Sequence, residues 1–212
     1  NCRQRRKTLP PKDRHEQARA LMTRPASSKT DIRRRICVFC GAQNAVSDRH
    51  KEAATQLGHR MANKQLGLVY GGGDCGLMGE VANAVLECGG WVTGVFPENL
   101  RNIEREHQDL SETVIVRDMH ERKQIMYKRS DIFVILPGGF GTLDETFEIL
   151  TWRQIRLHDK PVILFNHEGY WDHLVALFDT VISAGFARPE TRDFYEVLAT
   201  MDALMERLER GL

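Results

Sequence analysis

The sequence of 212 residues lacks any long uninterrupted apolar run. A membrane-spanning helix requires roughly 18 consecutive apolar residues, so we expect no membrane-spanning segment. The five cysteines are an odd number without the spacing of a disulfide framework, which favours a reducing compartment and predicts a cytoplasmic protein. The apolar share of 42% and the charged share of 28% are ordinary for a globular protein and exclude collagen-like, coiled-coil and fully disordered chains.

A large charge of either sign is also absent, because the net charge is only +1. This balance hides two regions of opposite sign. Residues 1–36 hold twelve basic and three acidic side chains, whereas the remaining 176 residues hold 18 basic and 26 acidic ones. We therefore assign residues 1–34 to a basic N-terminal arm outside the core and residues 35–212 to one globular domain. An acidic body is a poor platform for nucleic acid, and we expect the arm to be solvent-facing chain rather than a nucleic-acid ligand.

Short apolar runs with strand composition recur from residue 35 onward. They are Ile36–Cys40, Leu66–Tyr70, Trp91–Phe96, Thr113–Val116, Ile132–Leu136 and Val162–Phe165. Segments with helical spacing of apolar residues lie between most of them. Strands that alternate with helices predict an α/β fold, a Rossmann-like three-layer sandwich with a mostly parallel sheet flanked by helices. Ligands of such folds bind at the carboxyl ends of the strands, so the residues after each run are the candidates for a site.

The first glycine-rich loop, Gly71–Gly76, follows a predicted strand and precedes a predicted helix. Its spacing satisfies the dinucleotide pattern G-x-G-x-x-G, and Gly72 and Gly73 are candidates for close approach to a substrate. A tight strand–helix turn without a ligand explains the same residues. An NAD(P) enzyme would need an acidic residue at the end of the next strand, where Glu98 is the only close candidate.

The second glycine-rich loop, Pro137–Glu145, also follows a strand and begins a helix. Thr142 and Glu145 have the spacing of a capping box, with Thr142 as the helix N-cap. The same carboxylate would stand beside a potential anion site. Neither loop is followed by the lysine of a P-loop, so the sequence does not indicate ATP or GTP hydrolysis of that class. Two anion-binding loops on one sheet fit a dinucleotide enzyme poorly and favour a site that binds a mononucleotide from two sides.

These segments resemble the LOG ("Lonely Guy") family of cytokinin riboside 5′-monophosphate phosphoribohydrolases, long mislabelled as lysine decarboxylases. The resemblance covers about residues 35–210. It rests on Gly71–Gly79, Met119–Lys123 and Pro137–Glu145, with support from Ile36–Gly41 and Thr151–Gln154. It implies hydrolysis of N6-substituted adenosine 5′-monophosphates, with AMP as a plausible further substrate, to free base and ribose 5-phosphate. It also implies a homodimer, and no metal or redox cofactor is required.

The resemblance assigns Arg122 and Glu145 as the catalytic pair, without dividing the roles between them. The reaction also needs donors for a phosphate, and we expect the backbone N–H groups of Gly139, Gly141, Thr142 and Leu143 to supply them, with the Thr142 hydroxyl as a further contact. The predicted substrate-binding residues are Gly72, Gly73, Glu104, Lys123, Gly139, Phe140, Gly141, Thr142, Leu143, Asp144 and Thr151.

Three alternatives remain beside this hypothesis. A non-catalytic nucleotide-binding or carrier module would bind a nucleotide without releasing its base. An NAD(P) enzyme would use the first glycine loop. A lysine decarboxylase would need a Schiff-base lysine with its cofactor. Cys37 and Cys40 form a C-x-x-C pair, but residues three apart on a strand face opposite sides, so we expect core residues rather than a metal or redox site.

Two expectations concern the rest of the molecule. An exposed helix face with Phe147, Leu150 and Trp152 would be unusual for a monomer, which favours a dimer interface there. Deletion of residues 1–34 should leave the activity intact.

Overall fold

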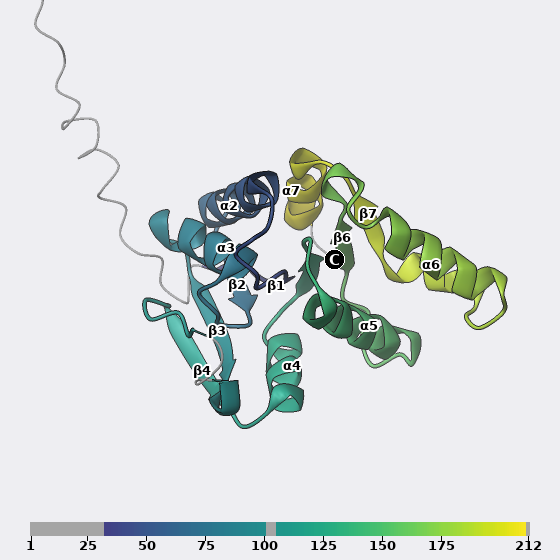
Figure 1. Ribbon diagram of the computed structural model, residues 1–212, viewed down its shortest axis with the longest axis horizontal. Coiled ribbons are helices and arrows are strands. Elements are labelled where there is room, and N and C mark those ends of the chain that lie inside the picture. The colour runs from purple at the N-terminus through teal and green to yellow at the C-terminus, as the bar shows by residue number, and fades with distance from the viewer. Residues whose placement is uncertain (1–31, 101–104, 211–212) are drawn as a thin grey trace, which may run out of the picture.

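Seven strands form one sheet in the computed structural model, which describes residues 32–100 and 105–210 (Figure 1). They are β1 (Arg34–Phe39), β2 (Leu66–Tyr70), β3 (Val92–Pro97), β4 (Glu112–Val116), β5 (Ile132–Ile135), β6 (Val162–Phe165) and β7 (Glu196–Leu198). Their order is β4-β3-β2-β1-β5-β6-β7, and every neighbouring pair is parallel. The predicted Rossmann-like parallel sheet is confirmed. Each of the six predicted strands exists, and only the three-residue β7 was not predicted.

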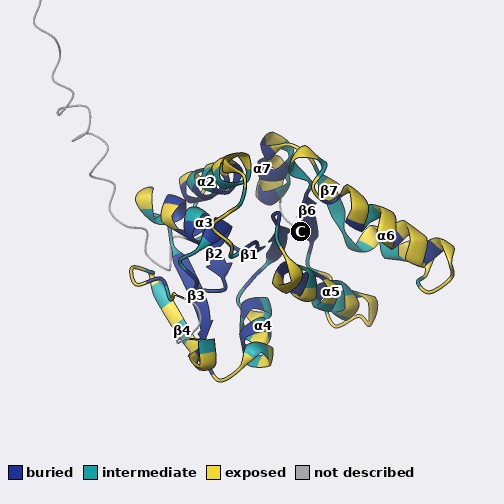
Figure 2. Ribbon diagram, in the orientation of Figure 1, coloured by how far each residue is buried: buried dark blue, intermediate teal, exposed yellow. Residues whose placement is uncertain are grey.

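Helices cover both faces of the sheet. One face carries α2 (Asp48–Asn63), α3 (Gly76–Glu87) and α7 (Met201–Arg210), and the other carries α4 (Met119–Lys128), α5 (Phe140–Gln154) and α6 (Asp172–Ser183). Short 3₁₀ turns lie at Glu98–Leu100, His167–Gly169 and Pro189–Phe194. Figure 2 shows the central strands buried between the two helical layers. This arrangement makes two apolar cores, one on each side of the sheet.

The pleat of β1 separates its side chains between these two cores. Ile36 and Val38 pack toward α2 and α3, whereas Cys37 and Phe39 pack toward α4, α5 and α6. Cys40 returns to the first core, so the two cysteines of the C-x-x-C pair lie on opposite faces. Burial raises the pKa of both thiols. The pair is therefore part of the cores, as predicted.

The N-terminal boundary differs slightly from the predicted one. Arg33 donates its N–H to Gln65 O at 3.0 Å, and β1 begins at Arg34, whose Nη1 donates to Leu208 O at 2.8 Å. A deletion of residues 1–34 would thus remove contacts of the sheet. Residues 1–31 of the basic arm lie outside the described residues. In the described ranges no helix is both long and apolar enough for a membrane span.

The order of the strands reverses between β1 and β5. The chain proceeds outward from β1 through β2 and β3 to one edge, and then returns to the other side of β1 with β5. At such a switch point the loops after the two neighbouring strands diverge to opposite faces, and a crevice opens at the carboxyl ends. The loops that follow β2 and β5 are the two glycine-rich loops that the sequence singled out.

Candidate active site

A cavity of about 530 Å³ lies at this switch point. Its floor and walls come from the carboxyl ends of β1, β2 and β5 and from the first turns of α2, α3, α4 and α5. The lining includes both predicted catalytic residues, Arg122 and Glu145, together with Gly139, Phe140, Gly141 and Thr142. Six predicted site residues from two distant segments therefore meet in one cavity.

The amino end of α5 opens into the cavity. The helix begins at Phe140 with Gly139 as N-cap, and no side chain caps it. The amides of Phe140, Gly141 and Thr142 belong to the first turn and precede any intrahelical acceptor, so they can donate to an anion. Leu143 already donates its N–H to Gly139 O at 3.0 Å. The expectation that the Leu143 amide binds a phosphate is therefore wrong, because this N–H is used within the helix, and the amides that stay open to an anion at the start of α5 are those of Phe140, Gly141 and Thr142.

The predicted capping box is wrong. Thr142 is the third residue of α5 and not its N-cap, because the helix begins at Phe140. Its side chain is buried and lies against Gly138, where any Cβ would overlap the Thr142 hydroxyl. By contrast, a Cβ at Gly139 or Gly141 would meet nothing within 4 Å, so these glycines leave open space for a ligand. Phe140 is 92% exposed beside them at the rim.

The first glycine loop has a different role from the one predicted by its dinucleotide pattern. At the start of α3, Gly76 N–H donates to Asn44 Oδ1 at 2.8 Å and Leu77 N–H donates to Gly41 O at 2.9 Å. Protein acceptors therefore occupy amides that a pyrophosphate would need. Gly72 accepts at its carbonyl from His107 N–H at 3.0 Å. This geometry disfavours the NAD(P) alternative.

Gly72 and Gly73 are not among the described residues that line the cavity. Gly73 instead forms an antiparallel bridge with Glu106. Their assignment as substrate-binding residues stays a prediction.

Arg122 projects from α4 into the cavity wall and is 6% exposed. Its Nε donates to Val95 O at 3.2 Å, and its Nη2 donates to Gly71 O at 3.0 Å. A Cβ at Gly71 would overlap Nη2, so only glycine leaves room for the guanidinium. Two backbone carbonyls at the ends of β2 and β3 thus fix a permanently charged group at the cavity.

Glu145 lies in the second turn of α5 and is 9% exposed. Burial raises the pKa of its carboxyl from 4.5 to about 7, and the positive charge of Arg122 opposes part of this shift. A carboxylate with a pKa near neutrality can take up and release a proton under physiological conditions. The cavity therefore holds one fixed cation and one titrating acid, next to three free amides.

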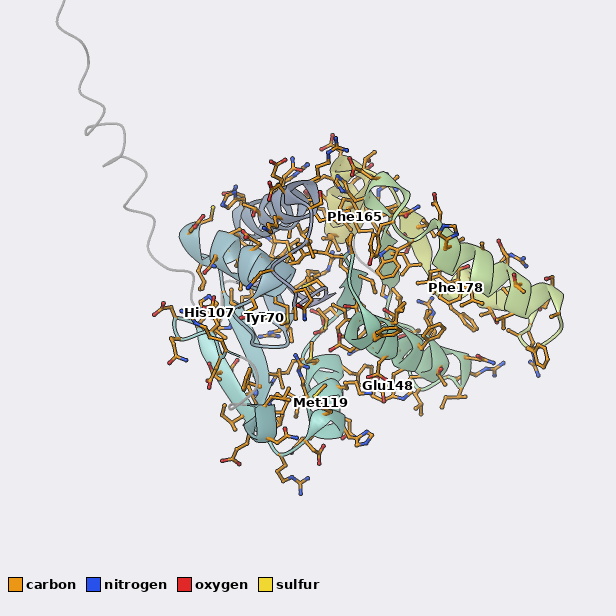
Figure 3. The ribbon with its side chains drawn as sticks, in the orientation of Figure 1. Tyr70, His107, Met119, Glu148, Phe165 and Phe178 are labelled. Atoms are coloured by element: carbon orange, nitrogen blue, oxygen red, sulfur yellow. The ribbon has the colours of Figure 1, made fainter. Side chains whose placement is uncertain are left out.

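Lys123 lies outside the cavity lining and joins the two helices that carry the predicted catalytic pair. From α4, its Nζ forms ion pairs with Asp144 Oδ2 at 3.1 Å and Glu148 Oε2 at 3.0 Å, both on α5. Figure 3 labels Glu148. Lys123 and Asp144, which are both predicted to bind substrate, thus form an ion pair with each other. Their direct role toward a substrate stays a prediction, and their visible role is to hold α4 against α5.

Of the two remaining predicted residues, one lies away from the cavity and the other is outside the described part of the chain. Thr151 is exposed on the last turns of α5 and is not part of the lining. Glu104 lies outside the described residues. Contact of Thr151 and of Glu104 with a substrate stays a prediction.

Sequence reasoning missed two cavity residues, His50 and Tyr170. Tyr170 donates its hydroxyl to Gly138 O at 2.7 Å, and the His50 ring meets the Tyr170 ring edge-on with centroids 5.5 Å apart. Tyr170 follows β6, so the rule that directs attention to strand ends could have found it. His50 stands in the first turn of a helix with no motif around it, and nothing in the sequence marks it.

Comparison with known proteins agrees with this geometry. Residues 78–208 match the family model described as "Possible lysine decarboxylase". Cytokinin riboside 5′-monophosphate phosphoribohydrolase LOG5 of Arabidopsis thaliana is 42% identical over 83% of this chain and 77% of its own length. The probable enzyme LOGL9 of Oryza sativa subsp. japonica is 44% identical over 83% of this chain and 78% of its own length. The probable enzyme LOG6 of Arabidopsis thaliana is 40% identical over 92% of this chain and 96% of its own length.

Similar solved structures include molybdenum cofactor carrier or binding proteins. The carrier protein from Chlamydomonas reinhardtii has a TM-score of 0.64 and 21% identity over 84% of this chain and 96% of its own length. The binding protein from Rippkaea orientalis has a TM-score of 0.63 and 18% identity over 84% of this chain and 97% of its own length. At this level of identity the likeness concerns the fold.

Proposed function

The chain belongs to the LOG family of phosphoribohydrolases, hydrolases of N-glycosidic bonds, and we propose that its substrates are N6-substituted adenosine 5′-monophosphates. The products are the free base and ribose 5-phosphate. The observation that carries this proposal is the position of Glu145, a buried acid in the same cavity as Arg122 and the free amides of α5. AMP fits the same requirements and is the second substrate that we propose.

The amino end of α5 binds the 5′-phosphate in this proposal. The amides of Phe140, Gly141 and Thr142 supply donors, and the helix dipole favours a negative charge at this end. Neither Gly139 nor Gly141 carries a side chain that would hinder the approach of the phosphate. A phosphate held here leaves the ribose within the cavity that Arg122 and Glu145 line.

Cleavage of the N-glycosidic bond places positive charge on the anomeric carbon, and a nearby carboxylate stabilises this charge. Ionised Glu145 can do so directly, or it can accept the proton of the attacking water. Arg122, fixed on Gly71 O and Val95 O, orients the substrate or assists the departing base. The geometry is compatible with either division of the roles.

A Schiff-base decarboxylase does not fit the cavity, because none of the described residues that line it is a lysine. A carrier module on the same fold remains the second candidate, and the fold of the molybdenum cofactor carrier proteins is the observation that favours it. Binding alone, however, gives no reason for an acid with a pKa near 7 in the cavity.

We also propose that two chains form a homodimer through α5 and α6. Phe147, Leu177 and Val181 expose 42%, 48% and 36% of their surfaces on these neighbouring helices. Leu150 and Trp152, which were expected on the same face, instead pack partly buried against the second core. The four cysteines of the described part are free thiols, in keeping with the proposed cytoplasmic location.

The decisive experiment measures base release from AMP and from isopentenyladenosine monophosphate by wild type and Glu145→Gln. We expect release by wild type and loss of release in the variant, which keeps the shape of the side chain but cannot ionise. Nucleotide binding without release by wild type would support the carrier module instead. The ratio of the two rates decides between the two proposed substrates.

A further inference from the structure

A short segment of chain is attached to the first glycine loop by backbone hydrogen bonds. Asp74 N–H donates to Arg105 O at 2.9 Å, and His107 N–H donates to Gly72 O at 3.0 Å. Gly73 and Glu106 form an antiparallel bridge between these two bonds. Residues 72–74 therefore hold residues 105–107 as a two-stranded clasp beside the carboxyl end of β2.

His107 is the last residue of this clasp, and its side chain is buried, with 4% of the residue surface exposed. Figure 3 labels this residue. Its Nδ1 accepts a hydrogen bond from Asp109 N–H at 3.2 Å, so this nitrogen carries no proton. Its Nε2 lies 3.0 Å from Asn83 Oδ1, which can only accept. With Nδ1 as acceptor, Nε2 is the ring nitrogen that donates to Asn83 on α3.

The same glycine loop provides one of the two carbonyls that hold Arg122. Gly71 O accepts from Arg122 Nη2 at 3.0 Å, and the next carbonyl along the chain, Gly72 O, accepts from His107 N–H. Two successive peptide groups therefore connect the buried histidine to the catalytic guanidinium. Gly72 adopts a φ of +80°, which glycine reaches without strain, and a glycine backbone is flexible unless hydrogen bonds such as the one from His107 N–H hold it in place.

We propose that His107 is a positioning residue, which fixes the Gly71–Gly72 backbone and through it the guanidinium of Arg122. Its attachment to Asn83 anchors the clasp to α3, a helix of the opposite face from α4. Arg122, which belongs to the helical layer of α4, is thereby also held in position by contacts from the layer of α3 on the other face of the sheet. This inference rests on the proposed function, because it assigns to His107 an effect on the step in which Arg122 takes part.

The test compares His107→Leu with a matched control, His158→Leu. His158 has the same pattern of contacts: its Nδ1 accepts from the N–H two residues later, and its Nε2 faces Ile149 O at 2.9 Å. It is not connected to the glycine loop. Each variant loses a histidine whose two ring nitrogens both form hydrogen bonds, so both substitutions should lower the thermal unfolding temperature. Only His107→Leu should displace Arg122.

The first readout is the side-chain Nε–H resonance of Arg122 in a ¹H–¹⁵N spectrum, assigned by its loss in Arg122→Lys. We expect slow solvent exchange in wild type and His158→Leu, and at least tenfold faster exchange in His107→Leu. This readout does not depend on catalysis. If wild type releases no base, the proposed function fails while the positioning by His107 is still tested.

The second readout is the pH profile of kcat. A displaced guanidinium stabilises the ionised Glu145 less, so the acid limb moves to higher pH in His107→Leu, and kcat at neutral pH falls about tenfold or more. Asn83→Ala, at an exposed position that removes only the acceptor, should give a smaller change in the same direction. If His107→Leu does not fold, Asn83→Ala tests the proposal in its place. An unchanged Arg122 resonance and acid limb in the folded variants would overturn the proposal.

Discussion

Arg122 and Gly71 are fitted so closely that a single added carbon at residue 71 would overlap the guanidinium. The carbonyl of Gly71 accepts from Nη2 of Arg122 at 3.0 Å. The residue that gives the arginine its space is thus also its hydrogen-bond partner. A motif that looks like a nucleotide-binding loop in the sequence thus holds, in the structure, the guanidinium of Arg122, a predicted catalytic residue.

Gly71→Ala should therefore impair catalysis through Arg122. The new Cβ displaces the guanidinium from Gly71 O, and loss of one aligned cation typically lowers kcat by about 10² to 10³. Steady-state rates of base release measure the effect. Because both changes remove the same interaction, Gly71→Ala in an Arg122→Ala background should cost almost nothing more. Fully additive losses in the double variant would contradict this relationship.

The rate of base release should depend on the ionisation of Glu145. Since burial raises the pKa of this carboxyl to about 7, the ionised fraction and kcat should both fall as the pH drops through 7. A rate profile between pH 5 and pH 9 checks this. An acid limb near pH 4.5 would show that the active group is an ordinary exposed carboxyl.

Glu145 should also make the protein less stable at alkaline pH. The folded state holds a proton on this residue up to about pH 7, whereas the unfolded chain loses it near 4.5, so stability falls as the pH rises between these values. Glu145→Gln removes this penalty, which is on the order of 3 kcal/mol at pH 8. Urea unfolding at pH 4 and pH 8 tests the expectation: the gain should appear at pH 8 only.

The two glycines before α5 should respond differently to alanine. Gly138→Ala forces a Cβ into Thr142 and should lower both the unfolding temperature and the affinity for the nucleotide. Gly139→Ala meets no protein atom within 4 Å, so the fold should be retained while the methyl group hinders the phosphate. Thermal melts and KM values separate the two. Equal unfolding temperatures in both variants would count against this packing.

A charged residue on the exposed face of α5 and α6 should separate the proposed dimer. Light scattering should give about twice the chain mass for wild type and the mass of one chain for Leu177→Asp, because a buried unpaired carboxylate is costly. Glu190, at an exposed position in the 3₁₀ turn after α6, offers a control as Glu190→Gln that should stay dimeric. A monomeric wild type would refute the dimer.

Much of this fold was predictable because parallel strands are buried on both faces. Runs such as Leu66–Tyr70 and Val162–Phe165 have the same bounds in the sequence analysis and in the structure. β7 has only three residues, none fully buried, and its pairing with β6 depends on tertiary contact rather than on its own pattern. Such an edge strand gives no reliable signal in a sequence.

The site was predicted in part, and the limits have physical causes. Arg122 and Glu145 stand in dense motifs, and the structure brings both to one cavity. The role of the first glycine loop depended on which acceptors meet its amides, and Asn44, the acceptor of Gly76 N–H, is remote in sequence. The helix start at Phe140 rather than after Thr142 followed from backbone geometry that residue types alone do not determine.

The reversal of strand order between β1 and β5 has a consequence for the newly made chain. β1 lies at the centre of the sheet, yet its second neighbour is made only after β2, β3 and β4. Arg122 on α4 directly precedes β5 and Glu145 on α5 directly follows it, whereas Ile36 of β1 pairs with Ile132 of β5 across the whole segment that holds β2, β3 and β4. Pairing two strands that lie so far apart in the sequence is a slow step of folding. The cavity, and with it any hydrolytic activity, should thus form during biosynthesis only after β5 has docked on β1 and brought the predicted catalytic residues Arg122 and Glu145 beside the carboxyl end of β1.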